Sequence, residues 1–163
     1  MRGLGLGFTM WVVLIFSGCS EPGLRDRIHD LEGRAFEGMV LDSEVRQDLM
    51  TEYANFARLF PEDSFAPEAL FRRADLLVHA GKYELAVLQL QNVHDGFPAF
   101  DKRPDCALMM AYVYDVHLKD KSLARRAYLR TEALHPGTPQ AEIALQSVAL
   151  LDQGAQWLVE PSR

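Results

Sequence analysis

A pair of prolines that recurs at a nearly constant interval constrains the fold of this chain more than any other feature of its sequence. The pairs are Pro61 with Pro67, Pro98 with Pro104, and Pro136 with Pro139. The first members of the three pairs are 37 and 38 residues apart. A proline ends a helix that it interrupts, whereas in the first turn of a helix it is well tolerated. The pattern therefore predicts a repeating helix–stop–helix unit, and such a period is typical of a helical solenoid.

Within each period the apolar residues recur three and four residues apart, which is typical of one face of a helix. The predicted helices span residues 67–79 and 83–93 in the first full repeat, 104–118 and 122–134 in the second, and 140–152 at the end. The last of them can cover the apolar end of the stack. No segment alternates apolar and polar residues as a strand would, so the predicted fold class is all-α.

A less regular pair of helices is predicted before the first full repeat. The apolar stripe of the first helix consists of Leu24, Ile28, Leu31 and Ala35 on an otherwise charged segment. A break around Gly38 follows, and Asp42 or Ser43 can cap the next helix. The apolar face of that helix consists of Val45, Leu49, Tyr53, Phe56 and Phe60. The helical domain is therefore expected over residues 24–152, with a tail at 153–163.

The first 18 residues have the features of a signal peptide rather than of the folded domain. Arg2 provides a short positive segment, and residues 4–16 are uncharged and largely apolar. This stretch is too short for a membrane-spanning helix, which needs roughly 20 apolar residues. Residues 19–23 are then expected to form a short tether ahead of the first helix.

The end of this segment, Phe16-Ser17-Gly18-Cys19, resembles the bacterial lipobox, although Phe16 stands where leucine is more common. The resemblance implies cleavage before Cys19 and acylation of that residue, with palmitate among the acyl groups, and several acyl chains anchor a protein stably. The alternatives are an ordinary signal peptide or an uncleaved anchor in which Cys19 is incidental. Ser20 is unlike the aspartate that marks retention in the inner membrane, which favours the outer membrane. The domain is expected at its periplasmic face, and exposure at the outer surface is the alternative.

The two full repeats resemble the tetratricopeptide-repeat (TPR) motif, a helical hairpin with large and small residues at set positions. The matching residues are Leu70, Ala74, Leu77, Gly81, Ala86, Leu90 and Pro98 in the first repeat, and Leu108, Ala111, Tyr114, Ala124, Tyr128 and Pro136 in the second. The second repeat has one extra residue, which is assigned to its turn at 119–121. The expected architecture is a TPR-like solenoid of two clear repeats, a degenerate N-terminal repeat and a C-terminal capping helix. A generic array of helical hairpins is the alternative.

The resemblance also implies where a partner binds, because TPR arrays hold partners on the concave face that the first helix of each hairpin lines. The residues expected on this face are Phe71, Asp75 and Val78 from the first repeat, and Met109, Tyr112 and Asp115 from the second. Core packing is the alternative role for Phe71 and Met109. A groove of this mixed aromatic, apolar and acidic character suits an extended or helical apolar segment that carries some positive charge.

The sequence carries no pattern typical of an enzyme or of a metal site. It contains none of the motifs HExxH, CxxC, GxSxG and GxxxxGK[ST]. The five histidines, at positions 29, 79, 94, 117 and 135, are scattered singly. A net charge of −6 offers no electrostatic reason to bind nucleic acid. Cys106 is expected to be a half-buried apolar residue rather than a redox or crosslinking group. No catalytic residue, cofactor or metal is therefore expected.

Taken together, residues 16–152 resemble small lipoproteins of the bacterial cell envelope. They are similar to the TPR coordinator of the Tol–Pal system and to the TPR lipoprotein of the outer-membrane β-barrel assembly machinery. The resemblance implies a non-catalytic scaffold that is anchored to the membrane by lipid and binds another envelope protein. One alternative is a permanent structural subunit of an outer-membrane complex. The other is a ligand-binding or enzymatic domain built on a helical-repeat frame.

Overall fold

A computed structural model describes residues 21–36 and 42–159 of the chain, and within these ranges the side chains of residues 21, 36 and 154–159 are left out. The predicted signal peptide, the lipidation residue Cys19 and the break around Gly38 lie outside the described residues.

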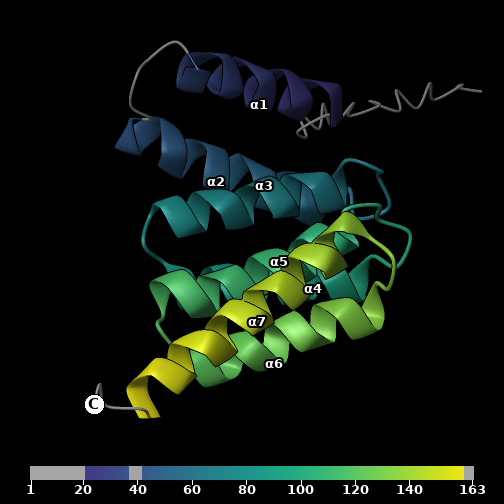
Figure 1. Ribbon diagram of the computed structural model, residues 1–163. Helices are drawn as coiled ribbons and strands as arrows, with labels where there is room; N and C mark the ends of the chain where they lie inside the picture. The colour runs from purple at the N-terminus through teal and green to yellow at the C-terminus, as the bar shows by residue number, and fades with distance from the viewer. Residues whose placement is uncertain (1–20, 37–41, 160–163) are drawn as a thin grey trace, which may run out of the picture.

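The described residues form seven α-helices and one π-helical segment, and no strand occurs among them. The elements are α1 (Glu21–Phe36), α2 (Ser43–Leu59), α3 (Ala66–His79), α4 (Tyr83–Gly96), α5 (Arg103–Tyr112), η1 (Val113–His117), α6 (Lys121–Leu134) and α7 (Pro139–Val159). Each helix packs against the next one along the chain, and α7 also contacts α5. Figure 1 shows the helices stacked from α1 at the top to α6 and α7 at the bottom. The all-α prediction is confirmed, and the packing order is compatible with a helical repeat.

The helix ends follow the local chemistry of the sequence. The Asp42 carboxylate accepts hydrogen bonds from the backbone N–H groups of Glu44 and Val45, so it caps α2 as predicted. Pro67 and Pro104 lie in the first turns of α3 and α5, where no backbone hydrogen bond is lost. Gly81 has φ +70° in the turn after α3, a conformation that glycine adopts without steric cost.

The two ends of the helical domain extend further than the sequence pattern predicted. The first helix begins at Glu21 instead of residue 24, so most of the predicted tether is helical. Pro22 favours this early start, since proline is well accommodated in the first turn of a helix. The last helix continues to Val159 instead of ending at residue 152. Residues 153–159 contain no proline, and the next proline is Pro161, so the predicted tail is largely helical.

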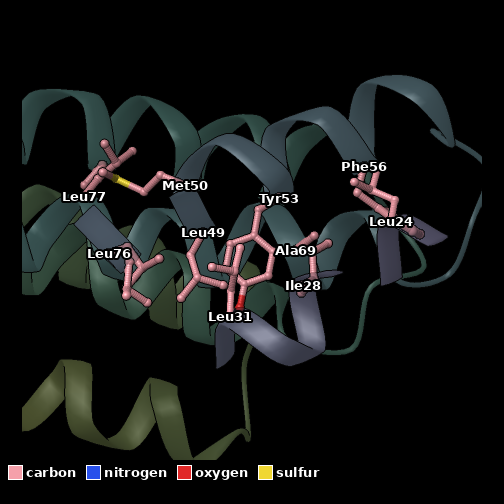
Figure 2. Packing of buried hydrophobic residues seen from close by; sticks show 12 residues of the cluster. Leu24, Ile28, Leu31, Leu49, Met50, Tyr53, Phe56, Ala69, Leu76 and Leu77 are labelled. Atoms are coloured by element: carbon pink, nitrogen blue, oxygen red, sulfur yellow. The ribbon is translucent and has the colours of Figure 1, made fainter. Parts of the chain in front are cut away.

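The apolar core runs along the whole stack as three clusters that share helices. The first, shown in Figure 2, joins α1, α2, α3 and α4 and contains Leu24, Ile28, Leu31, Leu49, Tyr53 and Phe56. The second joins α3, α4, α5 and η1 around Leu90, Val93 and Val113. The third joins α5, α6 and α7 around Tyr128 and Val148. The stripes predicted on α1 and α2 are therefore core residues, and only Phe60 and Ala35 among them are partly exposed.

Several small residues are fully buried between the helices. Ala111, Ala124 and Ala144 come from three different helices, have no exposed surface and belong to one cluster. Ala74 and Ala86 are likewise fully buried in the preceding repeat. A methyl side chain at these positions allows two helix backbones to pack closely, because it adds almost no volume between them.

The extra residue of the second repeat lies in a helix and not in the turn where the sequence comparison placed it. Ala111 follows Ala74 by 37 residues, whereas Ala124 follows Ala86 by 38, so the insertion falls between Ala111 and Ala124. In this interval α5 widens into the π-helix η1, where the Leu118 N–H donates to the Val113 carbonyl. A π turn holds one more residue than an α turn, so the insertion is absorbed without displacing α6.

The spacing of the second prolines also corrects one position of the repeat comparison. Pro104 follows Pro67 by 37 residues, so Leu108 occupies the position of Phe71 and not that of Leu70. The residue that corresponds to Leu70 is Ala107, which is buried.

Candidate partner-binding groove

A groove of about 580 Å³ opens between α1, α2 and α3. Its apolar lining consists of Ala35, Leu49, Tyr53, Phe71 and Leu76. Its polar lining consists of Glu32, Arg72, Asp75 and His79. The volume lies within the range of about 300–1,000 Å³ that is common for binding sites, and the mixture of an apolar wall with a few polar groups is also typical of them.

Two of the six residues predicted for the partner face, Phe71 and Asp75, line this groove. Phe71 is partly buried, with its ring edge-on to Phe100 at a centroid distance of 6.2 Å. The Asp75 carboxylate is 51% exposed and lies 3.6 Å from the His79 ring. Val78 does not line the groove and packs against the core.

The other predicted residues lie on α5 and η1, outside the groove. Met109 is partly buried against the second core cluster. Tyr112 is 48% exposed and meets the His117 ring edge-on. The Asp115 carboxylate pairs with Lys121 and accepts a hydrogen bond of 3.3 Å from the Tyr128 hydroxyl. Asp115 therefore joins η1 to α6, and the structure does not bring the six predicted residues into one site.

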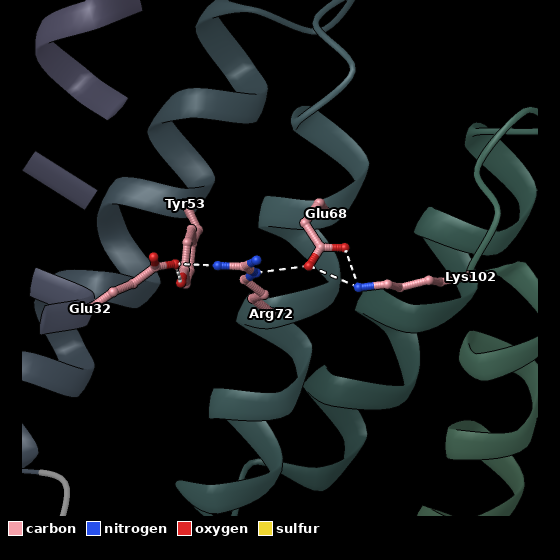
Figure 3. A network of polar contacts seen from close by, with 5 residues as sticks. All are labelled: Glu32, Tyr53, Glu68, Arg72 and Lys102. Atoms are coloured by element: carbon pink, nitrogen blue, oxygen red, sulfur yellow. Dashed lines mark hydrogen bonds and ion pairs between the residues drawn. The ribbon is translucent and has the colours of Figure 1, made fainter. Parts of the chain in front are cut away.

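A chain of ion pairs crosses the groove and joins four segments of the fold, as Figure 3 shows. The Arg72 guanidinium donates to Glu32 of α1 at 2.5 Å and to Glu68 of α3 at 2.8 Å. Glu32 also accepts from the Tyr53 hydroxyl of α2. At the far end Lys102, just before α5, donates to both oxygens of Glu68 at 2.9 and 3.0 Å.

Burial and the neighbouring charges shift the pKa values of Tyr53 and Glu68 in this network. Burial, followed by the hydrogen bond to Glu32, raises the pKa of the Tyr53 hydroxyl well above its usual value. Burial on its own would raise the pKa of Glu68, but hydrogen bonds from Lys102 and Arg72 outweigh it and hold that pKa below its usual value. Glu68 is therefore charged at neutral pH, and Tyr53 is a neutral donor.

Replacing Arg72 with methionine is expected to lower the free energy of unfolding by about 1–2 kcal/mol, because Glu32 and Glu68 lose their shared donor while they are only 20% and 16% exposed. The 43% exposure of Arg72 keeps the expected loss in this modest range. Urea denaturation followed by circular dichroism measures the change. Arg58→Met is the matched control, since Arg58 is exposed on α2. Equal stability of the two variants would show that the network contributes nothing.

The structure brings together two histidines that lie 41 residues apart in the chain. The Nε2 atoms of His94 at the end of α4 and His135 after α6 are 2.9 Å apart, and His94 Nδ1 lies 2.6 Å from the Asp95 carboxylate. His94 is only 3% exposed. Both residues lie near the end of the second helix of a hairpin, although at different repeat positions, since the residue 38 after His94 is Glu132. The histidines are scattered singly along the sequence, and the fold brings this pair together. Across residues 21–36 and 42–159, no three or more His, Cys, Asp or Glu side chains group as a metal ion would require.

Stability is expected to fall as the pH drops below about 6.5, the ordinary value for histidine, and His135 is one cause. Burial, and then the nearby His94 and Arg103, lower the pKa of His135. In the unfolded chain His135 therefore takes up a proton at a pH where it stays neutral in the folded chain, and this difference favours unfolding. Thermal unfolding of His135→Asn at several pH values is expected to show a weaker loss than the parent chain. His29→Asn, at an exposed site on α1, should keep the parental pH dependence; equal slopes in all three proteins would contradict the assignment.

Cys106 is fully buried in α5 and not half-buried as expected. Burial, with the nearby Asp105 carboxylate, raises the pKa of its thiol to about 12. The thiolate is the reactive form of cysteine, so this residue serves packing in the folded chain.

No family model matches this chain, and a search of curated proteins also finds no match. Among the described helices, none is both long enough and apolar enough to span a membrane.

Proposed function

We propose that this chain is a membrane-anchored scaffold that folds as a TPR-like array and binds another cell-envelope protein in the groove between α1, α2 and α3. The observation that carries the proposal is the groove itself, about 580 Å³ in volume and open within a stack of helical hairpins. Such stacks present extended surfaces to other proteins. The function is non-catalytic.

The repeat period and the small residues support the TPR assignment. The two full repeats begin with a helix turn that contains proline, the repeat period is 37 to 38 residues, and fully buried alanines lie at corresponding positions of both repeats. In each repeat, a carboxylate in the first turn of the first helix also accepts a hydrogen bond from a residue of the following repeat. Glu68 accepts from Lys102, and Asp105 accepts from the Gln140 amide at 2.8 Å. Corresponding positions therefore make corresponding contacts, which a generic set of hairpins does not require.

The proposed anchor is an acylated Cys19 that holds the array at the periplasmic face of the outer membrane. The lipobox-like segment before Cys19 is the support for this part of the proposal. Since α1 begins at Glu21, an acyl group on Cys19 would tether the start of the first hairpin to the membrane. Incorporation of radiolabelled palmitate that is lost in Cys19→Ala tests the anchor.

The lining of the groove indicates the chemistry of the partner. Phe71 and Leu76 provide an apolar wall, and the exposed Asp75 carboxylate adds a negative charge at the edge. The Arg72 charge is shared between Glu32 and Glu68. The groove therefore suits an apolar segment that carries a lysine or arginine, as the sequence resemblance also implied.

Crosslinking of the tagged protein in membranes, followed by purification and mass spectrometry, tests the scaffold. Asp75→Lys reverses an exposed charge in the groove without disturbing the core, and it is expected to abolish recovery of the dominant partner. Glu84→Lys makes the same change at an exposed site on α4 and should leave recovery unchanged. Absence of any partner, or equal recovery with both variants, would refute binding in this groove.

A permanent subunit of an outer-membrane complex is the second candidate, and the outer face of α7 favours it. Ile143, Leu145 and Leu150 are 49%, 47% and 67% exposed on this last helix. A helix that ends a repeat array in solution usually has a polar outer face. In this case the protein should stay in one complex through detergent purification, and Leu150→Lys with Ile143→Lys should release it, while Asp75→Lys should not.

A further inference from the structure

A second pocket, of about 190 Å³, lies between α4, α5 with η1, and α6. It shares no lining residue with the groove between α1, α2 and α3. Its apolar walls include Val87 from α4, Met110 from α5 and Ala127 from α6. We refer to it as the α4–α6 pocket. A dry protein cavity of roughly 150 Å³ can hold benzene, so this pocket can take one apolar group of about that size.

The rim of the α4–α6 pocket is positively charged, although the whole chain has a net charge of −6. Arg126 and Arg130, one turn apart on α6, both line it. Arg126 donates to the Ser122 hydroxyl at 2.9 Å. In the part of the chain that the structure describes, the one carboxylate within 4.0 Å of either guanidinium is Asp95, which is 4.0 Å from Arg130. Asp95 already accepts from His94 at 2.6 Å. The rim therefore keeps guanidinium donors without a closely bound carboxylate.

Comparison of the two repeats shows that this charge is not a by-product of the architecture. The same place one repeat earlier is a pocket of about 280 Å³ between α2, α3 and α4. There Arg73 stands where the later pocket has Met110, and it is held by the Met50 carbonyl at 3.1 Å and by the Gln89 amide oxygen at 2.5 Å.

At the rim the difference in charge is reversed, because the later pocket has arginines where the earlier repeat has uncharged residues. Arg126 corresponds to Leu88 and Arg130 to Asn92, each 38 residues earlier. The earlier pocket is therefore lined by Arg73, which is held by hydrogen bonds, and by Lys82 just before α4, but it has no cation at these two rim positions. The later pocket has an apolar interior and two cations at its rim, which is the arrangement that an amphiphilic anion needs.

We propose that the α4–α6 pocket binds a small carboxylate with an apolar body, such as an aromatic acid or the last residue of a polypeptide. The apolar body lies among Val87, Met110 and Ala127, and the carboxylate pairs with Arg126 and Arg130. Arginine suits this role because its planar guanidinium can hold a carboxylate with two parallel hydrogen bonds. The site does not depend on the proposed scaffold function, since it lies on other helices and needs no partner in the groove.

Titration of the full-length protein in detergent with benzoate, observed by NMR, tests the chemistry. A ligand of this size is expected to bind with a Kd of about 1 mM. Benzamide, which has the same shape without the charge, should bind at least about tenfold more weakly, the size expected for losing one charge-assisted interaction. Equal binding of benzoate and benzamide would overturn the carboxylate assignment.

Variants of the rim locate the site. Arg126→Gln with Arg130→Gln is expected to weaken benzoate binding at least about tenfold. Arg125→Gln is the matched control, because Arg125 lies on the same helix but pairs with Asp152 at 2.8 Å and does not line the pocket. Ala127→Met, which fills the pocket without changing charge, should also weaken binding. Unchanged binding in the double arginine variant would overturn the site.

A short peptide that ends in phenylalanine separates the two sources of the carboxylate. If the peptide binds more tightly than benzoate and amidation of its terminus removes the binding, the pocket takes a polypeptide terminus. If benzoate alone binds, and depends on the arginines, the pocket takes a free acid. Both results support the proposal. No binding of either probe at about 10 mM, roughly tenfold above the expected Kd, overturns it.

Discussion

Replacing Phe56 with alanine is expected to lower the free energy of unfolding by about 3–5 kcal/mol, the usual cost of emptying a large aromatic site in a core. Phe56 has no exposed surface and is the largest fully buried side chain among the described residues. Its ring lies 5.3 Å from that of Phe60 and 5.1 Å from that of Phe65, and the Arg25 guanidinium lies 4.8 Å above it. The substitution therefore removes contacts that join α1, α2 and the loop before α3.

Urea denaturation followed by circular dichroism measures this loss, and Leu59→Ala is the matched control. Leu59 lies on the same helix but is 40% exposed, so its truncation is expected to cost less than about 1 kcal/mol. Stability in a repeat array is set largely by contacts between neighbours. Amide exchange should therefore accelerate in α1 and α2 of Phe56→Ala before it does in α6. A cost no greater than that of Leu59→Ala would contradict the assigned role of Phe56.

The elements of the fold could be predicted because each depends on residues close together in the chain. Proline sets where α3 and α5 begin, Asp42 caps α2, and the stripe of Leu24, Ile28 and Leu31 faces the core. These effects act within one or two helix turns, so they are visible in the sequence. The order of packing follows from the short connections, which place each helix against the previous one.

The π-helix illustrates what spacing alone cannot determine. Comparison of the repeats reveals that one residue is inserted between Ala111 and Ala124. A longer turn and a widened helix both accommodate an insertion, and the choice depends on which side chains can remain buried. In the structure Val113 remains fully buried and Asp115 reaches Lys121 and Tyr128. The Asp115 contacts join η1 to α6, whereas Val113 packs in the second core cluster.

The candidate site was harder to predict because its residues come from distant parts of the chain. Phe71 and Asp75 could be found from their place on α3, but Glu32 lies 40 residues before Arg72. A charged residue on the solvent side of a helix looks the same in the sequence whether or not it has a partner. The same is true of His94 and His135, whose contact spans 41 residues. The repeat did not signal this contact either, since the two histidines lie near the ends of α4 and α6 but at different repeat positions.

The alanine cluster at the C-terminal end of the stack leads to a second large effect. Ala124→Leu is expected to lower the free energy of unfolding by about 3 kcal/mol, at the upper end of the usual cost of overpacking. Ala124 meets Ala111 and Ala144 in one cluster to which α5, α6 and α7 all contribute, and none of the three has exposed surface. The added side-chain carbons cannot be accommodated by moving one helix, because that helix is packed on two others.

Thermal and urea unfolding of Ala124→Leu beside Ala133→Leu separate this steric effect from helix propensity. Ala133 lies on the same helix and is exposed, and leucine is nearly as good a helix former as alanine, so its replacement should change stability by no more than about 0.5 kcal/mol. If Ala124→Leu is as stable as this control, Ala124 is not as tightly packed as its complete burial indicates. If instead it is destabilised and α7 exchanges its amides first, the alanine cluster is what holds the last helix on the stack, because α7 then separates from α5 and α6 before the rest of the array unfolds.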